Sequence, residues 1–158
     1  MKLRISTLWR VPVFCLISGV ISFYITVYIG GFFYTVTVVG SDGVTAFTAD
    51  PLRSAIFNGL LFLIVLLLGG LVFFRSMTKG EIAISAAIIS ALYFVVTLAQ
   101  LYIPGFPAVL NMKLAYFQNW TGTLASFLLK ITNHFQLSVL LANLAPFLFV
   151  PFGKKAAA

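Results

Sequence analysis

The sequence predicts an all-α, polytopic membrane protein, a bundle of four transmembrane helices with a small extracytoplasmic cap. Of its 158 residues, 61% are hydrophobic and 8% are charged, and the mean hydropathy is +1.10. Soluble domains carry about 25% charged residues, so this composition excludes an ordinary soluble enzyme and a nucleic-acid-binding domain. Residues 1–155 are predicted to form a single transmembrane domain, and 156–158 are interpreted as a cloning scar.

The spaces between charged side chains set the number of crossings. About 20 apolar residues are needed to cross the hydrocarbon core as a helix. Four uncharged runs are long enough: those between Arg10 and Asp42, Arg53 and Arg75, Glu81 and Lys113, and Lys130 and Lys154. Because backbone groups in lipid must be satisfied within the segment, these runs are predicted to be helical. The expected helices lie at about 11–33, 52–75, 79–103 and 124–152.

The first run begins with basic residues, which fits either a retained helix or a cleaved signal peptide. Its apolar stretch is longer than a signal peptide requires, and no small-residue cleavage site follows Cys15, so a retained helix is predicted. The basic residues then set the orientation, because lysine and arginine concentrate on the cytoplasmic side. With both termini in the cytoplasm, that side holds Lys2, Arg4, Arg10, Arg75, Lys79, Lys154 and Lys155, and the other keeps Arg53, Lys113 and Lys130. We therefore expect a multi-pass protein of the cell membrane, in bacteria the cytoplasmic membrane, with cytoplasmic termini.

Local signals mark the ends of the second and third helices. Asp50 is an N-cap residue followed by a proline at the first helical position, where the missing N–H group costs no hydrogen bond. Thr78 and Glu81 have the spacing of a capping box, so the third helix begins directly after a short loop. Pro104 and Gly105 end that helix. The second and third helices are therefore predicted to be antiparallel neighbours.

A β-hairpin is predicted over residues 34–48, as the first part of the cap. The segment is rich in β-branched residues on both sides of a Gly-Ser-Asp-Gly turn signal. In the alternative interpretation, the first helix continues to Val39 and a loop follows. An exposed hairpin edge is a candidate docking surface.

An interfacial helix on the outer leaflet is predicted over residues 106–120, as the second part of the cap. Tyr116 and Trp120 are residue types that gather at the headgroup level, and apolar residues accompany them. In the alternative interpretation, the chain re-enters the membrane at Thr123–Leu129, and the long side chain of Lys130 reaches back out.

Residues suited to catalysis or metal binding are few in this chain. The acidic residues are Asp42, Asp50 and Glu81; a turn explains the first, and helix caps explain the other two. With His134 as its only histidine and Cys15 as its only cysteine, one chain cannot supply a bis-histidine haem, a cysteine-rich metal site or an internal disulfide. We therefore expect neither an enzyme nor a bound metal or cofactor.

Five residues within the predicted helices are candidates for contact with a ligand or a partner. They are Asn58, Gln100, Gln136, Asn143 and Pro146. Polar side chains at bilayer depth are costly unless they have a partner. Asn143 is the deepest of them, and Pro146 removes a backbone hydrogen bond beside it, which exposes a carbonyl group. Hydrogen bonds between helices are the alternative role for these side chains.

The third helix carries a stripe of small residues. Its members are Ala83, Ala87 and Ala91, with Ser90 beside them. Small side chains let another helix approach closely, and close packing drives helix association in lipid, where burial of apolar surface does not. The stripe packs either within the four-helix bundle, with Gly69-Gly70 of the second helix as its mate, or against another subunit.

The third helix begins Thr78-Lys79-Gly80-Glu81-Ile82-Ala83-Ile84-Ser85-Ala86-Ala87-Ile88-Ile89-Ser90-Ala91-Leu92-Tyr93, and it ends at Ile103-Pro104-Gly105. This stretch resembles the opening helix of the substrate-binding components of energy-coupling-factor vitamin transporters. The resemblance implies that the Ala-x-x-x-Ala stripe docks a transmembrane coupling subunit. It covers less than a fifth of the chain, lies in the third helix instead of the first, and accompanies fewer crossings than that family has. Membership of the family is therefore not inferred.

Three functions remain open for this chain. A non-enzymatic accessory or assembly subunit, acting through helix packing, is the preferred prediction because it fits the small-residue stripe and the shortage of ionisable groups. The alternative is a transport or substrate-binding component for an uncharged or apolar solute, which fits Asn58, Asn143 and Pro146. An intramembrane enzyme acting on lipid is disfavoured by the few acids and the single histidine. The expected partners are the lipid bilayer and another membrane subunit or a second copy of the chain.

Overall fold

The computed structural model of the chain describes residues 7–39, 43 and 45–155. Within these ranges, four helical segments are long and apolar enough to cross a membrane: Arg10–Tyr34, Pro51–Phe73, Lys79–Tyr102 and Phe135–Phe152. This mostly helical chain with a small two-stranded sheet is consistent with the predicted all-α membrane protein. Lys2, Arg4, the predicted turn residue Asp42 and the interpreted cloning scar at 156–158 lie outside the described residues.

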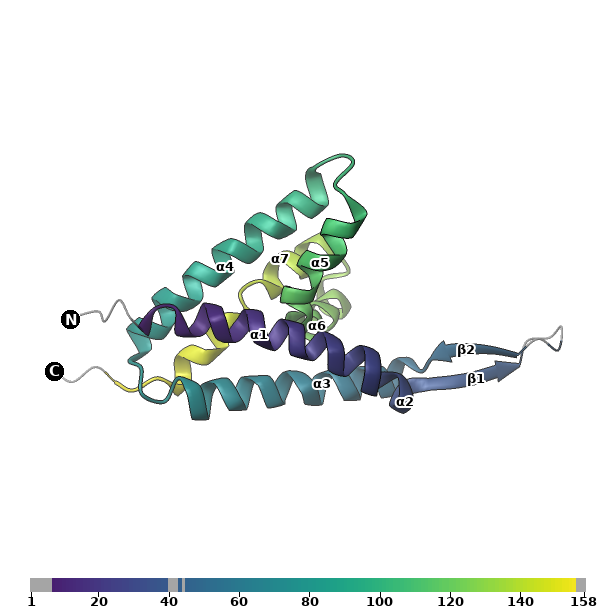
Figure 1. Ribbon diagram of the computed structural model, residues 1–158, viewed down its shortest axis with the longest axis horizontal. Helices are drawn as coiled ribbons and strands as arrows, with labels where there is room; N and C mark the ends of the chain where they lie inside the picture. Colours follow the sequence, from purple (N-terminus) through teal and green to yellow (C-terminus); the bar gives the residue numbers. More distant parts are fainter. Residues whose placement is uncertain (1–6, 40–42, 44, 156–158) are drawn as a thin grey trace.

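The first segment is a helix with an irregular end. Helix α1 (Arg10–Ile25) continues through a π-helical stretch at Thr26–Gly30 into the short helix α2 (Gly31–Tyr34). Small side chains are prominent on the buried face of α1, which includes Cys15, Ser18, Gly19 and Ser22. That face packs against the helices at Lys79–Tyr102 and Ala108–Gln118, while α1 also runs alongside α3 (Pro51–Leu67) (Figure 1).

The predicted β-hairpin is confirmed. Strands β1 (Thr35–Val39) and β2 (Thr45–Ala49) pair antiparallel, with Thr35 opposite Ala49 and Val39 opposite Thr45. β1 follows α2 without a linker, so the hairpin projects from the end of the helices (Figure 1).

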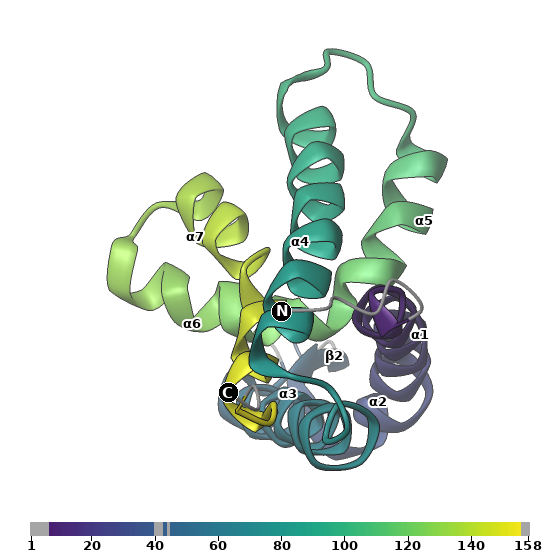
Figure 2. The same cartoon turned by 90° about the vertical axis from the view of Figure 1, so that its left-hand side faces the viewer.

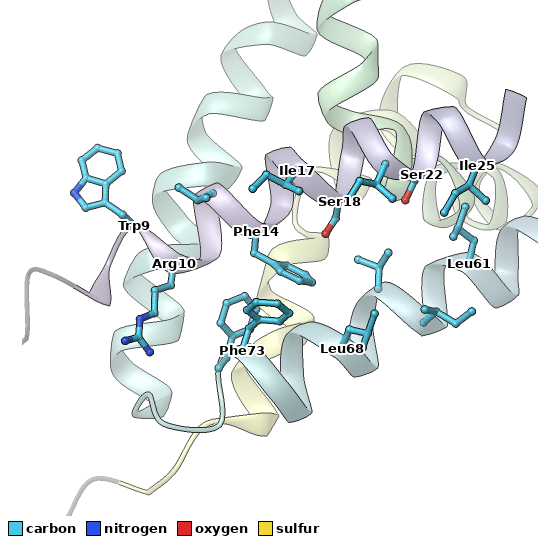
Figure 3. A pocket seen from close by; sticks show the side chains of 15 residues that line it. Trp9, Arg10, Phe14, Ile17, Ser18, Ser22, Ile25, Leu61, Leu68 and Phe73 are labelled. Atoms are coloured by element: carbon cyan, nitrogen blue, oxygen red, sulfur yellow. The ribbon is translucent and has the colours of Figure 1, made fainter. Parts of the chain in front are cut away.

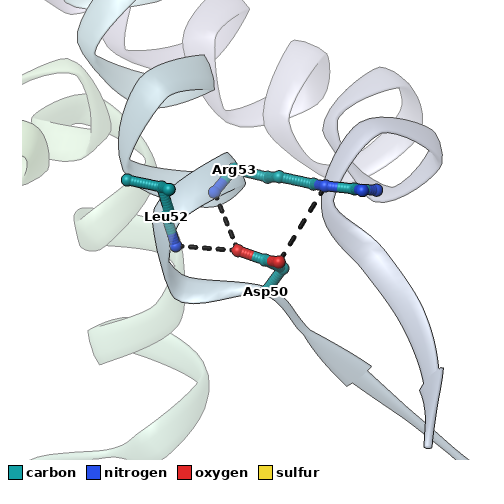
Figure 4. A network of polar contacts seen from close by, with 3 residues as sticks. All are labelled: Asp50, Leu52 and Arg53. Atoms are coloured by element: carbon teal, nitrogen blue, oxygen red, sulfur yellow. Dashed lines mark hydrogen bonds and ion pairs between the residues drawn. The ribbon is translucent and has the colours of Figure 1, made fainter.

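Helix α3 (Pro51–Leu67) begins at the predicted cap. The carboxylate of Asp50 accepts hydrogen bonds from the backbone N–H groups of Leu52, at 2.9 Å, and Arg53, at 3.0 Å (Figure 4). These are two of the donors that a helix start leaves without partners. The Nε atom of Arg53 also lies 3.9 Å from the same carboxylate.

A second π-helical stretch, Leu68–Phe73, completes this span. Phenylalanine rings fill the space beside its glycines. Phe149, Phe14 and Phe74 pack against Gly69, and Phe152 packs against Gly70. The rings of Phe14, Phe74 and Phe149 pack edge to face, and their centroids are 4.9–5.8 Å apart. This aromatic cluster joins the first, second and last spans near the turn that leads to α4.

Helix α4 (Lys79–Tyr102) begins with the predicted capping box. The Glu81 carboxylate accepts a hydrogen bond from the Thr78 N–H at 2.9 Å, and the Thr78 hydroxyl oxygen accepts one from the Glu81 N–H at 3.3 Å. The described end of the chain is tied to the same turn, because the backbone N–H of Lys154 donates to the Met77 carbonyl oxygen at 2.9 Å, and the Lys154 carbonyl oxygen accepts from the Lys79 N–H at 3.0 Å. The second and third spans are joined by this short turn, as predicted.

A fourth span is present at Phe135–Phe152, but the continuous helix predicted at 124–152 is wrong, because the chain breaks twice within that range. Helix α6 (Gly122–Thr132) ends at Asn133, whose φ of 54° is left-handed and stops the helix. Helix α7 (Phe135–Ala142) then leads into a 3₁₀ helix at Ala145–Phe152. Pro146 and Pro151 lack the N–H groups that an α-helix needs, which explains the change of helix type.

The predicted interfacial helix at 106–120 also needs correction. Helix α5 (Ala108–Gln118) and a 3₁₀ turn at Asn119–Thr121 occupy this segment. The end of α5 lies against Gly19 and Tyr93, which are near the middles of α1 and α4, whereas an interfacial helix would stay near the ends of the spans. A helix in this segment is confirmed, but its position at the ends of the spans is not; the alternative, re-entry at Thr123–Leu129, stays a prediction.

The six longer helices of the described residues are arranged as three pairs. Seen along α1 and α3, the pair of α4 and α5 points one way and the pair of α6 and α7 another, with α1 and α3 below them (Figure 2). The segment at Asn119–Gly122, between α5 and α6, therefore lies where the three pairs meet.

Gly19→Ala is expected to destabilise the protein by about 1–3 kcal/mol, the usual cost of overpacking. A methyl group at this position would lie 2.2 Å from the carbonyl oxygen of Phe117, so α5 has to move away from α1. Chemical unfolding in detergent micelles measures the change. Gly59→Ala is the control: nothing lies within 4 Å of the added methyl group, and a stability gain of about 0.5–1 kcal/mol is expected in mid-helix. Equal effects of the two substitutions would contradict the close approach of α5.

Candidate functional site

Two adjoining cavities lie on either side of α6. The α3–α6 cavity, of about 720 Å³, is lined by residues of α3 and α6 together with Thr26 and Asn119. The α4–α7 cavity, of about 360 Å³, is lined by residues of α4, α5, α6 and α7. Both cavities are lined by Asn119, Gly122 and Ser126. Their volumes fall within the ~300–1,000 Å³ that small-molecule sites usually occupy.

Asn58 is the centre of a polar network in the α3–α6 cavity. Its Nδ2 atom donates to the Ser54 carbonyl oxygen at 2.9 Å, and its Oδ1 atom accepts from the Thr26 hydroxyl at 3.5 Å. The hydroxyl of Thr123, on α6, donates to the backbone carbonyl oxygen of Asn58 at 3.1 Å. These bonds connect the first span, α3 and α6, so the polar wall of the cavity is held in place from three sides.

Lys130 lines the same cavity from the last turn of α6. A cation at this end of a helix interacts favourably with the partial negative charge of the last carbonyl groups. Among the residues that the structure describes, no carboxylate lines either cavity. The lining polar groups are therefore amides, hydroxyls and one ammonium group.

Asn143 is the most deeply buried polar side chain of the α4–α7 cavity. Its Nδ2 atom donates to the Thr97 hydroxyl oxygen at 3.0 Å, and both residues are only 1% exposed. Gln100, which also lines this cavity, donates to the Asn111 carbonyl oxygen at 3.4 Å. Gln118 donates to the Tyr93 carbonyl oxygen at 3.2 Å. Each of these amides keeps an oxygen acceptor that no protein donor occupies among the described residues.

Tyr93 lines neither cavity but holds the turn whose residues contribute to both. Its hydroxyl donates to the Phe117 carbonyl oxygen at 2.9 Å and accepts from the indole N–H of Trp120 at 3.3 Å. Tyr93 and Trp120 are 1% and 2% exposed, so this contact is buried. It holds the turn before α6 against the middle of α4, and with it the shared residues Asn119 and Gly122.

The structure brings three of the five predicted site residues to these cavities. Asn58 lines the α3–α6 cavity, while Gln100 and Asn143 line the α4–α7 cavity. Pro146 is buried just after Asn143 and starts the 3₁₀ helix, and Gln136 is exposed on the first turn of α7 and lines neither cavity.

The sequence analysis missed Asn119 and Ser126. Together with Gly122 they are spaced three, four and seven apart, which places them on one face of a helix. That spacing was an available signal for a polar face, but Asn119 had been assigned to the interfacial helix and Ser126 to the fourth transmembrane helix, so the prediction divided this face between two elements.

The predicted packing face of α4 is divided by the structure. Ser90 is 3% exposed and Ala83 is half-buried, whereas Ala87 and Ala91 are exposed. The chain itself packs against a neighbouring face of α4, formed by Ile82, Ser85, Ala86, Ile89 and Tyr93. The predicted mate, Gly69-Gly70, packs against phenylalanine rings instead.

Comparison of the chain with protein-family models, with curated proteins and with solved structures finds no match.

The hydrogen bond between Asn143 and Thr97 is expected to contribute about 0.6 kcal/mol and at most about 1.7 kcal/mol, as such bonds do within membranes. The measurement is a double-mutant cycle of Asn143→Leu and Thr97→Val, with unfolding followed in detergent micelles. Purely additive losses of stability would show that the two side chains do not stabilise each other.

Proposed function

We propose that this chain is a non-enzymatic integral membrane protein that binds a small, uncharged polar solute in the two cavities around α6. One observation carries this proposal: Asn58, Gln100 and Asn143, which belong to three different spans, surround one short helix. The sequence favoured an assembly subunit and gave a solute-binding component as the alternative; this convergence supports the alternative.

The energetics of polar groups in a membrane support the proposal. Amide side chains within membrane-spanning segments are costly, so their presence points to a structural or a binding role. Helix packing alone does not require cavities beside them, because cores otherwise fill their interior space. Here the amides line cavities and keep acceptors available, which suits a solute that presents hydroxyl or amide groups.

The irregular helices beside the cavities support it as well. Thr26 lies in a π-helical stretch, and such stretches are frequent at functional sites. Asn143 lies between an α-helix and a 3₁₀ helix, at a break in the last span. In membrane transport proteins, interrupted helices form solute sites because their ends present backbone groups without helical partners.

The test is native mass spectrometry of the protein extracted gently from its own membrane. The wild-type chain is expected to carry a small additional mass, and Ser126→Leu is expected to lose it, because this side chain lines both cavities. Ser126 lies on the surface of α6, and its hydroxyl bonds only within its own helix, to the Gly122 carbonyl oxygen. Ile88→Leu, on the exposed face of α4, is the matched control and should keep the mass. A wild-type chain without a small additional mass would overturn the proposal.

A second candidate function, assembly with another membrane subunit, is favoured by the exposed residues Ala87 and Ala91. Small side chains on an exposed helix face allow another transmembrane helix to approach closely. In this function the α4 face packs against a helix of another subunit or of a second copy of the chain.

Ala87→Leu combined with Ala91→Leu separates the two functions. The larger side chains keep a partner helix away, so any complex formed through this face should be lost, while solute binding around α6 should persist. The subunit composition after gentle extraction measures the first effect, and retention of the small mass measures the second. Loss of the solute with an intact complex would be the opposite of this expectation.

A further inference from the structure

A third cavity, independent of those around α6, lies between α1 and α3. It has a volume of about 670 Å³ and shares no lining residue with the other two. We call it the α1–α3 groove (Figure 3). Apolar side chains dominate its lining, among them Val13, Ile17 and Ile21 of α1, and Leu61 and Ile64 of α3.

The two ends of the groove differ in chemistry. Trp9 and Arg10 lie at one end and Ile25 and Leu61 at the other (Figure 3). Trp9 is 65% exposed, and tryptophan favours the headgroup level of a membrane. The groove therefore runs from a polar, cationic mouth into an apolar interior, which is the polarity of an amphiphile.

The charge of Arg10 is not matched by a carboxylate in the part of the chain that the structure describes. Its Nη1 atom donates to the Ser76 hydroxyl oxygen at 3.0 Å, and the side chain is exposed. The guanidinium group has five N–H donors in a planar fork, so donors remain for an external acceptor. Asp50 lies at the far end of α3, beside Arg53, and Glu81 is buried in the capping box.

Further cations stand at the same end of the molecule. Arg75 precedes Ser76 in the turn that Arg10 contacts, and Lys79 and Lys154 are joined through their backbones beside that turn. A cluster of basic side chains at a membrane surface attracts anionic lipids, and arginine binds phosphate in a bidentate way. The mouth of the groove is thus complementary to a phosphate group.

The length of the groove fits a lipid chain. The stretch of α1 from Arg10 to Ile25 rises about 22 Å at 1.5 Å per residue. The hydrocarbon core of a bilayer is about 30 Å thick, so one leaflet contributes about 15 Å of acyl chain. A chain that enters beside Arg10 can lie along α1 through its whole leaflet.

We propose that the α1–α3 groove binds one acyl chain of an anionic phospholipid, with the lipid phosphate on Arg10. Phe14 and Phe73, whose ring centroids are 5.0 Å apart, form the wall beside the phosphate, and the aliphatic side chains contact the acyl chain. This site differs from the one proposed around α6 and does not depend on it.

The experiment uses the full chain in nanodiscs made of equal parts of phosphatidylcholine and phosphatidylglycerol. Native mass spectrometry after release is expected to show retained phosphatidylglycerol in preference to phosphatidylcholine. Arg10→Gln should reduce that preference about tenfold, since hydrogen bonds to a charged group are the strong ones. Ile21→Trp, which fills the groove, should reduce the retention of both lipids.

Two variants separate lipid binding from folding. Ser76→Ala removes the hydrogen bond that Arg10 makes within the chain but keeps its charge, so the preference should survive. Arg53→Gln removes a cation at the opposite end of α3 and should also leave the preference unchanged. Equal retention of the two lipids by the wild type, an unchanged preference in Arg10→Gln, or a second protein chain in place of lipid would each overturn the proposal.

Discussion

The arrangement of the helices depends on the hydrogen bonds of the Tyr93 hydroxyl group. This group is bonded to the end of α5 through the Phe117 carbonyl oxygen, and to the turn between α5 and α6 through the Trp120 indole. Gly19 provides the opposing surface, because the absence of a side chain there lets the α5 backbone touch α1. With the reversal held at the middle of α4, α6 begins among the spans, and polar residues from three of them surround it. Without the hydrogen bonds of Tyr93, nothing would hold the turn between α5 and α6 at the middle of the spans.

The elements that the sequence predicts well are those with local causes. The caps at Asp50 and at Thr78–Glu81 depend on residues within one helical turn, and both helices begin where those residues place them. The hairpin follows from β-branched runs on both sides of a turn signal. The prediction of one continuous helix at 124–152 failed because the apolar composition continues across Asn133. The break there depends on the backbone conformation of that one residue, which composition does not reveal. The position of α5 depends on Gly19 and Tyr93, which are far away in the sequence.

The candidate site shows the same division between local and distant causes. Asn58, Gln100 and Asn143 were identified by the cost of polar groups in an apolar helix, and this cost is a property of each residue alone. Which residues share a cavity depends on tertiary contacts, so Asn119, in the turn before α6, and Ser126, in α6, were missed. Gln136 has the same chemistry as Gln100, yet α7 begins only at Phe135, and this places Gln136 on an exposed first turn.

The helix type of the last span has a consequence for how it matches a bilayer. A 3₁₀ helix rises about 2.0 Å per residue and an α-helix about 1.5 Å, so the eight residues of Ala145–Phe152 gain about 4 Å in length. This span has 18 residues, the fewest of the four. As a continuous α-helix it would extend about 27 Å, short of the ~30 Å hydrocarbon core. The prolines that prevent a regular helix thus stretch the shortest span toward the thickness of the membrane.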